Sequence, residues 1–218
     1  GKSTLGRALL RLEKSNGEVT FEGRSLQGLN AKEMRPLRRE MQIVFQDPFG
    51  SLSPRLSVRQ IVEEGLLVHG IGGGFDGRRK LVEDVLAEVD MEPETMNRYP
   101  HEFSGGQRQR IGIARAIALD PRVIIADEAT SALDGSIRAQ ILDLLLDLRD
   151  ELDLAILFIA HDIGVVRYFC DRVAVMHRGR VVETGPAVQI CDAPQAPYTQ
   201  RLISAVPIPD PRKRHLVA

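Results

Sequence analysis

The chain has 218 residues, and 43% of them are hydrophobic, which is enough for one substantial core or for a core with an inserted subdomain. Its 29 basic and 30 acidic residues give a formal net charge of −1, so no global field favours nucleic acid or an anionic membrane. Two cysteines are too few for a metal cluster or a disulfide framework, and no apolar stretch approaches the roughly 20 residues of a membrane-spanning helix. We therefore expect Cys170 and Cys191 to be reduced thiols of a cytoplasmic protein, whose membrane role would require a partner.

The sequence begins with Gly1-Lys2-Ser3-Thr4, which matches the end of the phosphate-loop pattern G-x-x-x-x-G-K-S/T. In that pattern the lysine reaches the β- and γ-phosphates of a nucleotide, and the Ser or Thr hydroxyl coordinates Mg²⁺. Apolar residues then recur at helical spacing, so we expect a helix behind the loop. We expect the rest of the loop and its leading strand upstream of Gly1. Because these four residues are common by chance, the hypothesis depends on the other motifs.

Two short strands are predicted next. Residues 17–23 alternate in polarity between glycines, which is typical of an edge strand and turn, and residues 41–45 form a second apolar run. Gln46 follows that run. From the residues alone, Gln46 can be explained as the polar end of a strand before the turn at Asp47 and Pro48.

Residues 50–118 predict helices. Residues 58–66 and 79–89 are amphipathic, with a glycine-rich stretch at 69–77 between them. That stretch is not a second phosphate loop, because no strand leads into it and no Lys-Ser or Lys-Thr follows it; a flexible connector is expected.

Ser104 and the glycines after it precede an apolar run at helical spacing, which predicts a helix whose first N–H groups are free. Such a helix start attracts phosphate, because its unpaired donors and the positive end of the helix dipole coincide. An ordinary helix with a flexible glycine start is the alternative, and only the neighbouring motifs decide against it.

Residues 123–126 are continuously apolar, which predicts a central parallel strand buried on both faces. Asp127 and Glu128 end this run, and paired carboxylates there are costly unless a cation or a substrate proton is present. We expect Asp127 to hold the Mg²⁺ shell and Glu128 to polarise an attacking water as general base. Since adjacent strand residues point in opposite directions, the two carboxylates can serve separate tasks.

Two further strand features follow. Residues 154–160 predict another buried strand, and His161 lies at its C-terminal end, where open α/β sheets place their ligands. Residues 173–177 and 180–183 predict a β-hairpin.

Residues 137–148 carry an apolar stripe at helical spacing, which is best explained as core packing.

Together these motifs resemble the ATP-binding-cassette (ABC) ATPases, and residues 104–107 have the form of that family's signature sequence. The resemblance covers essentially the whole chain. It implies an α/β P-loop NTPase (RecA-like) core with an antiparallel β edge and an inserted α-helical subdomain. The expected domains are a nucleotide-binding core at 1–49 and 119–185, a helical subdomain with the signature at 50–118, and a C-terminal tail at 186–218.

The resemblance also implies roles for single residues. Gln46 would contact Mg²⁺ and the attacking water and relay the nucleotide state, His161 would contact the γ-phosphate, and the loop ending at Asp134 would contact a partner subunit. The expected nucleotide-binding residues are Gly1, Lys2, Ser3, Thr4, Gln46, Ser104, Gly105, Gly106, Gln107 and Asp134; the expected metal ligands are Ser3, Gln46 and Asp127; the expected catalytic residues are Glu128 and His161.

Within the family, the chain is similar to the ATPase subunits of dipeptide and oligopeptide importers at residues 46–52, 99–103, 197–199 and 204–207. Nickel importers share these sequence motifs. Ala129 stands where proline is usual, which weakens only the subfamily match. The resemblance implies ATP and Mg²⁺ as cofactors and a peripheral position on the cytoplasmic face of the membrane. The implied partners are transmembrane permease subunits, a second ABC ATPase packed head to tail (identical or related) and, indirectly, an extracytoplasmic solute-binding protein.

Two alternatives stay open. A soluble ABC ATPase for DNA repair or ribosome handling is disfavoured, because the chain has no zinc-type cysteines, no coiled-coil insertion and no basic excess; no nucleic-acid partner is expected. The other alternative is an inactive fragment, because half of the phosphate loop is missing from the sequence.

Overall fold

The computed structural model describes residues 1–205 and divides the chain into two compact units. One unit is Ser3–Ile159, and the other joins Gly1–Lys2 to the chain from Ala160 onward. The predicted core, helical and tail domains are a different, sequence-based division, which stays a prediction. None of the described helices combines the length and the apolar composition that a membrane span requires.

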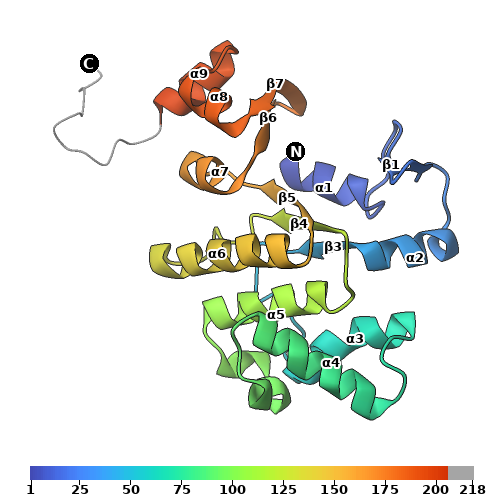
Figure 1. Ribbon diagram of the computed structural model, residues 1–218. Helices are drawn as coiled ribbons and strands as arrows, with labels where there is room; N and C mark the ends of the chain where they lie inside the picture. Colours follow the sequence, from blue (N-terminus) through green and yellow to red (C-terminus); the bar gives the residue numbers. More distant parts are fainter. Residues whose placement is uncertain (206–218) are drawn as a thin grey trace. The chain divides into compact units, whose positions relative to one another are not determined.

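A parallel sheet is the centre of the first unit (Figure 1). Its strands are β3 (Met41–Val44), β4 (Val123–Asp127) and β5 (Ala155–Ile159), with β4 in the middle. The prediction of a central parallel strand is confirmed: Ile125 pairs with Ile43 on one side and Leu157 on the other and is 2% exposed. A strand flanked on both sides and covered on both faces must be apolar throughout, which explains the unbroken hydrophobic run.

Three helices accompany this sheet: α1 (Lys2–Leu9), α2 (Ala31–Glu40) and α6 (Gly135–Glu151). Gly6 of α1 is buried, and a Cβ there would lie 3.0 Å from Ile159 Cδ1 and 3.2 Å from Ile125 Cγ2. The helix that follows the phosphate-loop residues is therefore held close to the C-terminal halves of β4 and β5. The strand predicted within residues 17–23 is present but short: β1 (Thr20–Phe21) pairs antiparallel with β2 (Arg24–Ser25) in a two-stranded sheet separate from the parallel one.

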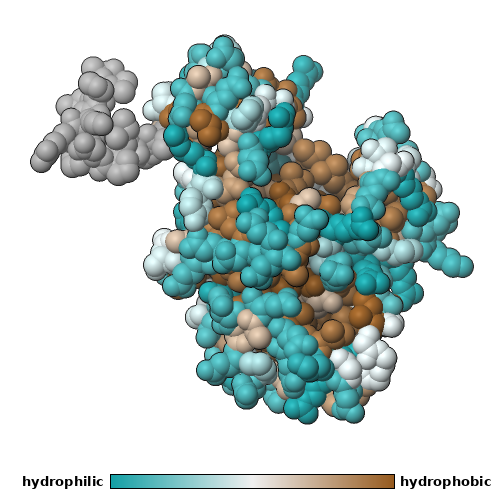
Figure 2. Space-filling view, viewed as in Figure 1, coloured by the Kyte–Doolittle hydropathy of each residue, from teal (hydrophilic) through white to brown (hydrophobic). Residues whose placement is uncertain are grey.

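The chain between β3 and β4 is helical where described. It contains α3 (Val58–His69), α4 (Phe75–Glu88), the 3₁₀ turns η1 (Pro93–Asn97) and η2 (Pro100–Glu102), and α5 (Gly105–Ile117), which gather on one side of the sheet in Figure 1. Their visible surface in Figure 2 is mostly hydrophilic, with hydrophobic residues showing in places between them. Buried apolar residues on three of these helices, such as Leu66, Leu86 and Ile113, are 0% exposed, so the helices pack around a core.

The glycine-rich connector is shorter than predicted. Gly70 ends α3 in the left-handed conformation (φ 67°), but α4 already begins at Phe75. Arg78 explains this difference, because its side chain donates to the Gly73 carbonyl (2.7 Å) and to the buried carboxylate of Glu63 (2.8 Å). A buried carboxylate needs such partners, and Glu63 thereby ties the connector to α3.

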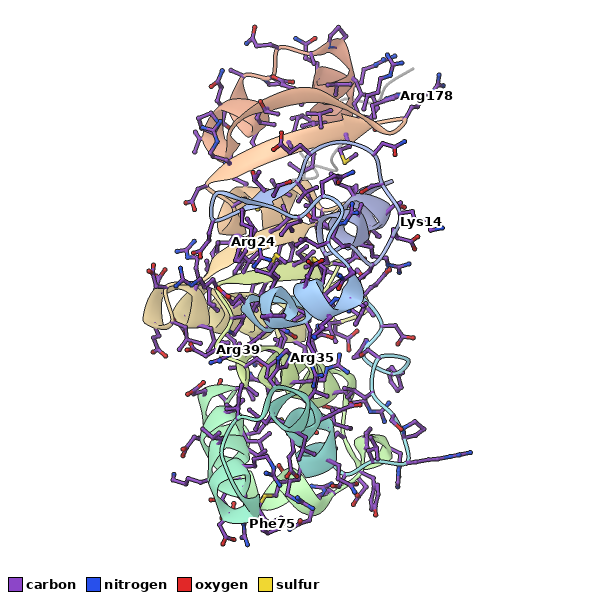
Figure 3. The ribbon with its side chains drawn as sticks, turned by 90° about the vertical axis from the view of Figure 1, so that its right-hand side faces the viewer. Lys14, Arg24, Arg35, Arg39, Phe75 and Arg178 are labelled. Carbon is purple, nitrogen blue, oxygen red and sulfur yellow. The ribbon has the colours of Figure 1, made fainter. Side chains whose placement is uncertain are left out.

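Two arginines of α2, labelled in Figure 3, anchor this helix to the helical segment. Arg35 donates to the carbonyl of Val68 near the end of α3, and Arg39 Nε donates to the Leu119 carbonyl at 3.3 Å. Carbonyls at helix ends lack partners within the helix, so cationic donors there are favourable.

The second unit contains α7 (Ile163–Phe169), the strands β6 (Arg172–His177) and β7 (Arg180–Pro186), α8 (Ala187–Asp192) and α9 (Pro197–Ser204). The predicted hairpin is confirmed, since β6 and β7 pair antiparallel through a turn at Arg178 and Gly179, both with positive φ. The tail from residue 206, including Pro207 and the basic run at 212–215, lies outside the described residues.

Candidate active site

Ser3 and Asp127 come together although 124 positions separate them. Ser3 Oγ, in the first turn of α1, donates a 2.8 Å hydrogen bond to Asp127 Oδ1 at the end of β4. Asp127 is 4% exposed, so its charge depends on such donors. A hydroxyl beside a carboxylate is the oxygen donor pair that Mg²⁺ prefers. No group of three or more His, Cys, Asp or Glu that could hold a metal ion occurs among the described residues.

Glu128 leaves the strand instead of continuing it. β4 ends at Asp127, and Glu128 adopts a left-handed backbone conformation (φ 50°), which is strained for a residue with a Cβ. Its backbone N–H donates to the Ile159 carbonyl at 2.9 Å. The expectation that strand alternation separates the two carboxylates was therefore wrong in its reason: a backbone turn, held by β5, determines the direction of Glu128.

Gln46 reaches Glu128 from the end of β3. Its Nε2 donates to Glu128 Oε2 at 3.1 Å and to Ser131 Oγ at 3.3 Å, and Ser131 Oγ donates to the Glu128 carbonyl at 3.0 Å. These bonds fix the orientation of one carboxylate, which is a requirement for a group that must take a proton from a positioned water. The ends of β3 and β4 thus bring together two of the predicted residues, and Ser131 joins them.

Lys2 and His161 belong to the other unit. Lys2 Nζ donates to the Ala160 carbonyl at 2.7 Å, so the lysine lies beside the residue that precedes His161. His161 is exposed, and Asp162 after it caps α7 by accepting from the Gly164 N–H at 2.8 Å. The remaining residues of the opening motif, Gly1 and Thr4, are also exposed.

The predicted helix start after Ser104 is confirmed as the start of α5, but the Ser104 side chain caps this helix and so occupies one of the N–H groups that were expected to be free. Its Oγ accepts from the Gln107 N–H (3.3 Å), while Gln107 Oε1 accepts from the Ser104 N–H (3.0 Å), a reciprocal capping box. The glycines have a packing reason as well: a Cβ on Gly106 would lie 2.5 Å from Ile137 Cγ2 of α6. Asp134 is exposed and precedes α6, and its side chain makes no capping hydrogen bond within the described residues.

Comparison with known proteins decides the family. A family model described as ABC transporter matches residues 1–131, and one described as the C-terminal region of oligopeptide/dipeptide transporters matches residues 182–218. The chain belongs to the ABC transporter ATPases. A Brucella ovis protein, whose name places it among peptide import ATP-binding proteins, is 52% identical over 98% of this chain and 68% of its own. The glutathione import ATP-binding protein of Salmonella typhi is 54% identical over 98% of this chain and 34% of its own.

A solved ATP-binding cassette has the same fold as this chain. The ATP-binding cassette MJ0796, in a dimeric post-hydrolysis state bound to ADP and Pi, matches with a TM-score of 0.75 and 32% identity, over 86% of this chain and 81% of its own. The predicted fold class, an ABC ATPase cassette with a parallel sheet, is therefore confirmed.

Sequence reasoning missed three residues of this ABC ATPase. Ser131 was assigned only to the loop ending at Asp134, although it links Gln46 to Glu128. Arg108 and Arg115 of α5 contact the turn after Gln46: Arg115 Nη1 donates to the Ser51 carbonyl at 2.7 Å, and the Arg108 guanidinium lies 3.9 Å from the Phe49 ring centroid. The two arginines are seven residues apart, which is two helical turns and places them on the same face of α5. This spacing was the signal in the sequence that could have identified them.

The cysteines are free in the structure. Burial, with contributions from Asp171 and Cys191, raises the pKa of the Cys170 thiol to about 11. Burial also raises the pKa of Cys191. A raised pKa keeps a thiol protonated near neutral pH, which lowers its reactivity as a nucleophile.

Proposed function

We propose that this chain is the ATP-hydrolysing subunit that powers peptide import across the cytoplasmic membrane. The ATPase role rests on two hydrogen bonds at the strand ends. Ser3 donates to Asp127, and Gln46 donates to Glu128. Peptide as the solute is supported by the match to the oligopeptide/dipeptide C-terminal region and by the names of the Brucella relatives. Nickel or another solute is the alternative.

Each residue has a chemical role in this proposal. Lys2 binds the β- and γ-phosphates of ATP, and Ser3 with Asp127 would hold Mg²⁺, which supplies charge neutralisation on the phosphates. The Glu128 carboxylate accepts the proton of the attacking water, and Gln46 keeps that carboxylate oriented. His161 would contact the γ-phosphate at the end of β5.

The proposal needs a second cassette. The chain has two helix starts suited to phosphate, at α1 and at α5, which is more than one γ-phosphate requires. We infer that ATP lies between the phosphate loop of one subunit and Ser104, Gly105 and Gly106 of the other, packed head to tail. Closure of this dimer on ATP and its opening after hydrolysis would move the permease subunits, which would contact the helical segment. An extracytoplasmic binding protein would deliver the solute. This places the cassette peripherally on the cytoplasmic face.

Sedimentation of Glu128→Gln, made in the product of the intact gene, tests the shared site. With ATP and Mg²⁺ we expect a dimer that is absent without nucleotide, and Ser104→Arg should abolish it. Ser57→Arg is the matched control, because Ser57 caps α3 with the same capping box and should leave the dimer intact. A monomer that still binds ATP would require a different partner cassette, whereas loss of ATP binding altogether would contradict the proposed site.

The solute needs its own experiment. A strain lacking this gene should take up labelled di- and oligopeptides less well, with recovery by the wild-type gene and not by Glu128→Gln. Normal peptide uptake together with lost nickel uptake would reject peptide as the solute and keep the ATPase assignment.

A further inference from the structure

The chain directly after Gln46 forms a compact hydrogen-bonded turn. The Asp47 carbonyl accepts from the Ser51 N–H at 3.1 Å, and Asp47 Oδ1 accepts from the Phe49 N–H at 2.8 Å. A Cβ on Gly50 would lie only 2.6 Å from Asp47 Oδ2, so no larger residue fits without rearrangement. Because the turn is internally bonded and continuous with Gln46, a displacement of the turn displaces Gln46.

Two arginines of α5 hold this turn from outside. Arg115 Nη1 donates to the Ser51 carbonyl at 2.7 Å, and burial lowers the pKa of the Arg115 guanidinium, partly offset by Glu64. A desolvated guanidinium that donates to a carbonyl makes a strong, charge-assisted bond. Arg108, on the same helical face, stacks over Phe49 and donates through Nε to the Pro100 carbonyl at 2.7 Å.

The N-terminal end of α5 also touches the segment that follows Glu128. A Cβ on Gly106 would meet Ile137 at 2.5 Å, and one on Gly105 would meet Leu133 at 3.7 Å. One helix, which begins at Ser104, therefore contacts the segments after both Gln46 and Glu128.

We propose that Arg115 and Arg108 are positioning residues that couple the start of α5 to the Gln46–Glu128 hydrogen bond. When Ser104 engages the nucleotide held by a second subunit, the movement of α5 carries the turn at 47–51, and Gln46 then sets the carboxylate of Glu128. The inference rests on the proposed function and adds two residues that act through the turn after Gln46. A 1 Å misplacement of a catalytic group is enough to reduce turnover, so such a coupling has a measurable effect.

Steady-state kinetics of three α5 variants test the coupling. We expect Arg115→Ala to lower kcat by roughly tenfold to a hundredfold with little change in the KM for ATP, since chemistry and not binding is impaired. Arg115→Lys should recover most of the loss, because a lysine can still donate to the Ser51 carbonyl. Arg110→Ala is the matched control: Arg110 is in the same helix but donates to the Val89 carbonyl and pairs with Asp90, both at 2.7 Å.

A fluorescent reporter separates coupling from simple destabilisation. The sequence contains no tryptophan, so Phe49→Trp places a reporter on the turn and keeps a ring for Arg108. Phe49 is 63% exposed, so this change leaves the core intact. In a Glu128→Gln background, ATP should change the indole emission; adding Arg115→Ala should remove the change, and adding Arg110→Ala should not.

The outcomes are distinct. Wild-type kcat and an intact emission response in folded Arg115→Ala would overturn the coupling and leave the ATPase proposal standing. Equal losses in Arg115→Ala and Arg110→Ala would also overturn it, because the effect would then be general to the helix. If wild-type protein neither hydrolyses ATP nor dimerises as Glu128→Gln, the proposed function fails, and the coupling fails with it.

Discussion

Two serines at helix starts, Ser3 and Ser104, are alike in sequence and different in use. Ser3 Oγ donates across the fold to the buried carboxylate of Asp127, whereas Ser104 Oγ accepts from the N–H of Gln107, three residues ahead. The Ser3 hydroxyl is therefore bonded to the carboxylate of Asp127 at the end of β4. Ser104 Oγ shapes the start of its own helix, and Gly106 in the first turn packs on Ile137 of α6. A helix start that suits phosphate can therefore belong to a site within the chain or be presented to another molecule.

The largest effect should come from Glu128, the residue after the carboxylate that Ser3 binds. We expect Glu128→Gln to retain ATP binding and to lose turnover by about 10²- to 10⁴-fold, because an amide cannot accept the proton of the attacking water. Phosphate release and binding of a labelled ATP analogue measure the two properties. Glu83→Gln, which removes a surface ion pair with Arg79, should leave both unchanged. Equal turnover in Glu128→Gln and wild type would reject Glu128 as the base.

The two serines themselves should differ in their response to metal. Ser3→Ala removes an expected Mg²⁺ ligand and leaves Asp127 without that donor, so the Mg²⁺ concentration for half-maximal ATPase activity should rise at least about tenfold. Ser104→Ala should leave the Mg²⁺ requirement unchanged and lower stability by roughly 1 kcal/mol through the lost cap. Titration of Mg²⁺ at fixed ATP measures the first effect. A similar shift in both variants would remove the distinction between the two helix starts.

The smallest effect concerns the glycines of α5. Gly106→Ala should destabilise the protein by about 1–3 kcal/mol, since its Cβ would overlap Ile137. Gly112→Ala is the control in the same helix, because a Cβ there meets nothing within 4 Å; it should be neutral or stabilising by up to about 1 kcal/mol. Urea unfolding measures both. If Gly106→Ala is as stable as Gly112→Ala, close packing of the signature helix on α6 is not required.

Local patterns predicted most of the elements correctly. The continuous apolar run of β4, the antiparallel β1–β2 pair and the β6–β7 hairpin each depend on neighbouring residues only, so their periodicity and turns are visible in the chain. The connector before α4 was predicted too long, because the bonds of Arg78 to Gly73 and Glu63 involve a partner on another helix.

The family, the helix start at Ser104 and the residue types at the strand ends could be predicted from the sequence alone, because motifs and helix starts are encoded within a few consecutive residues. How those residues contact one another depends on the packing of the folded chain. The left-handed turn at Glu128 and the bridge from Gln46 through Ser131 depend on strands β3, β4 and β5 lying side by side. The hydrogen bond from Arg115 to the Ser51 carbonyl, in the turn after Gln46, joins residues that are 64 positions apart in the sequence. Long-range contacts of this kind follow from packing, which no local pattern specifies.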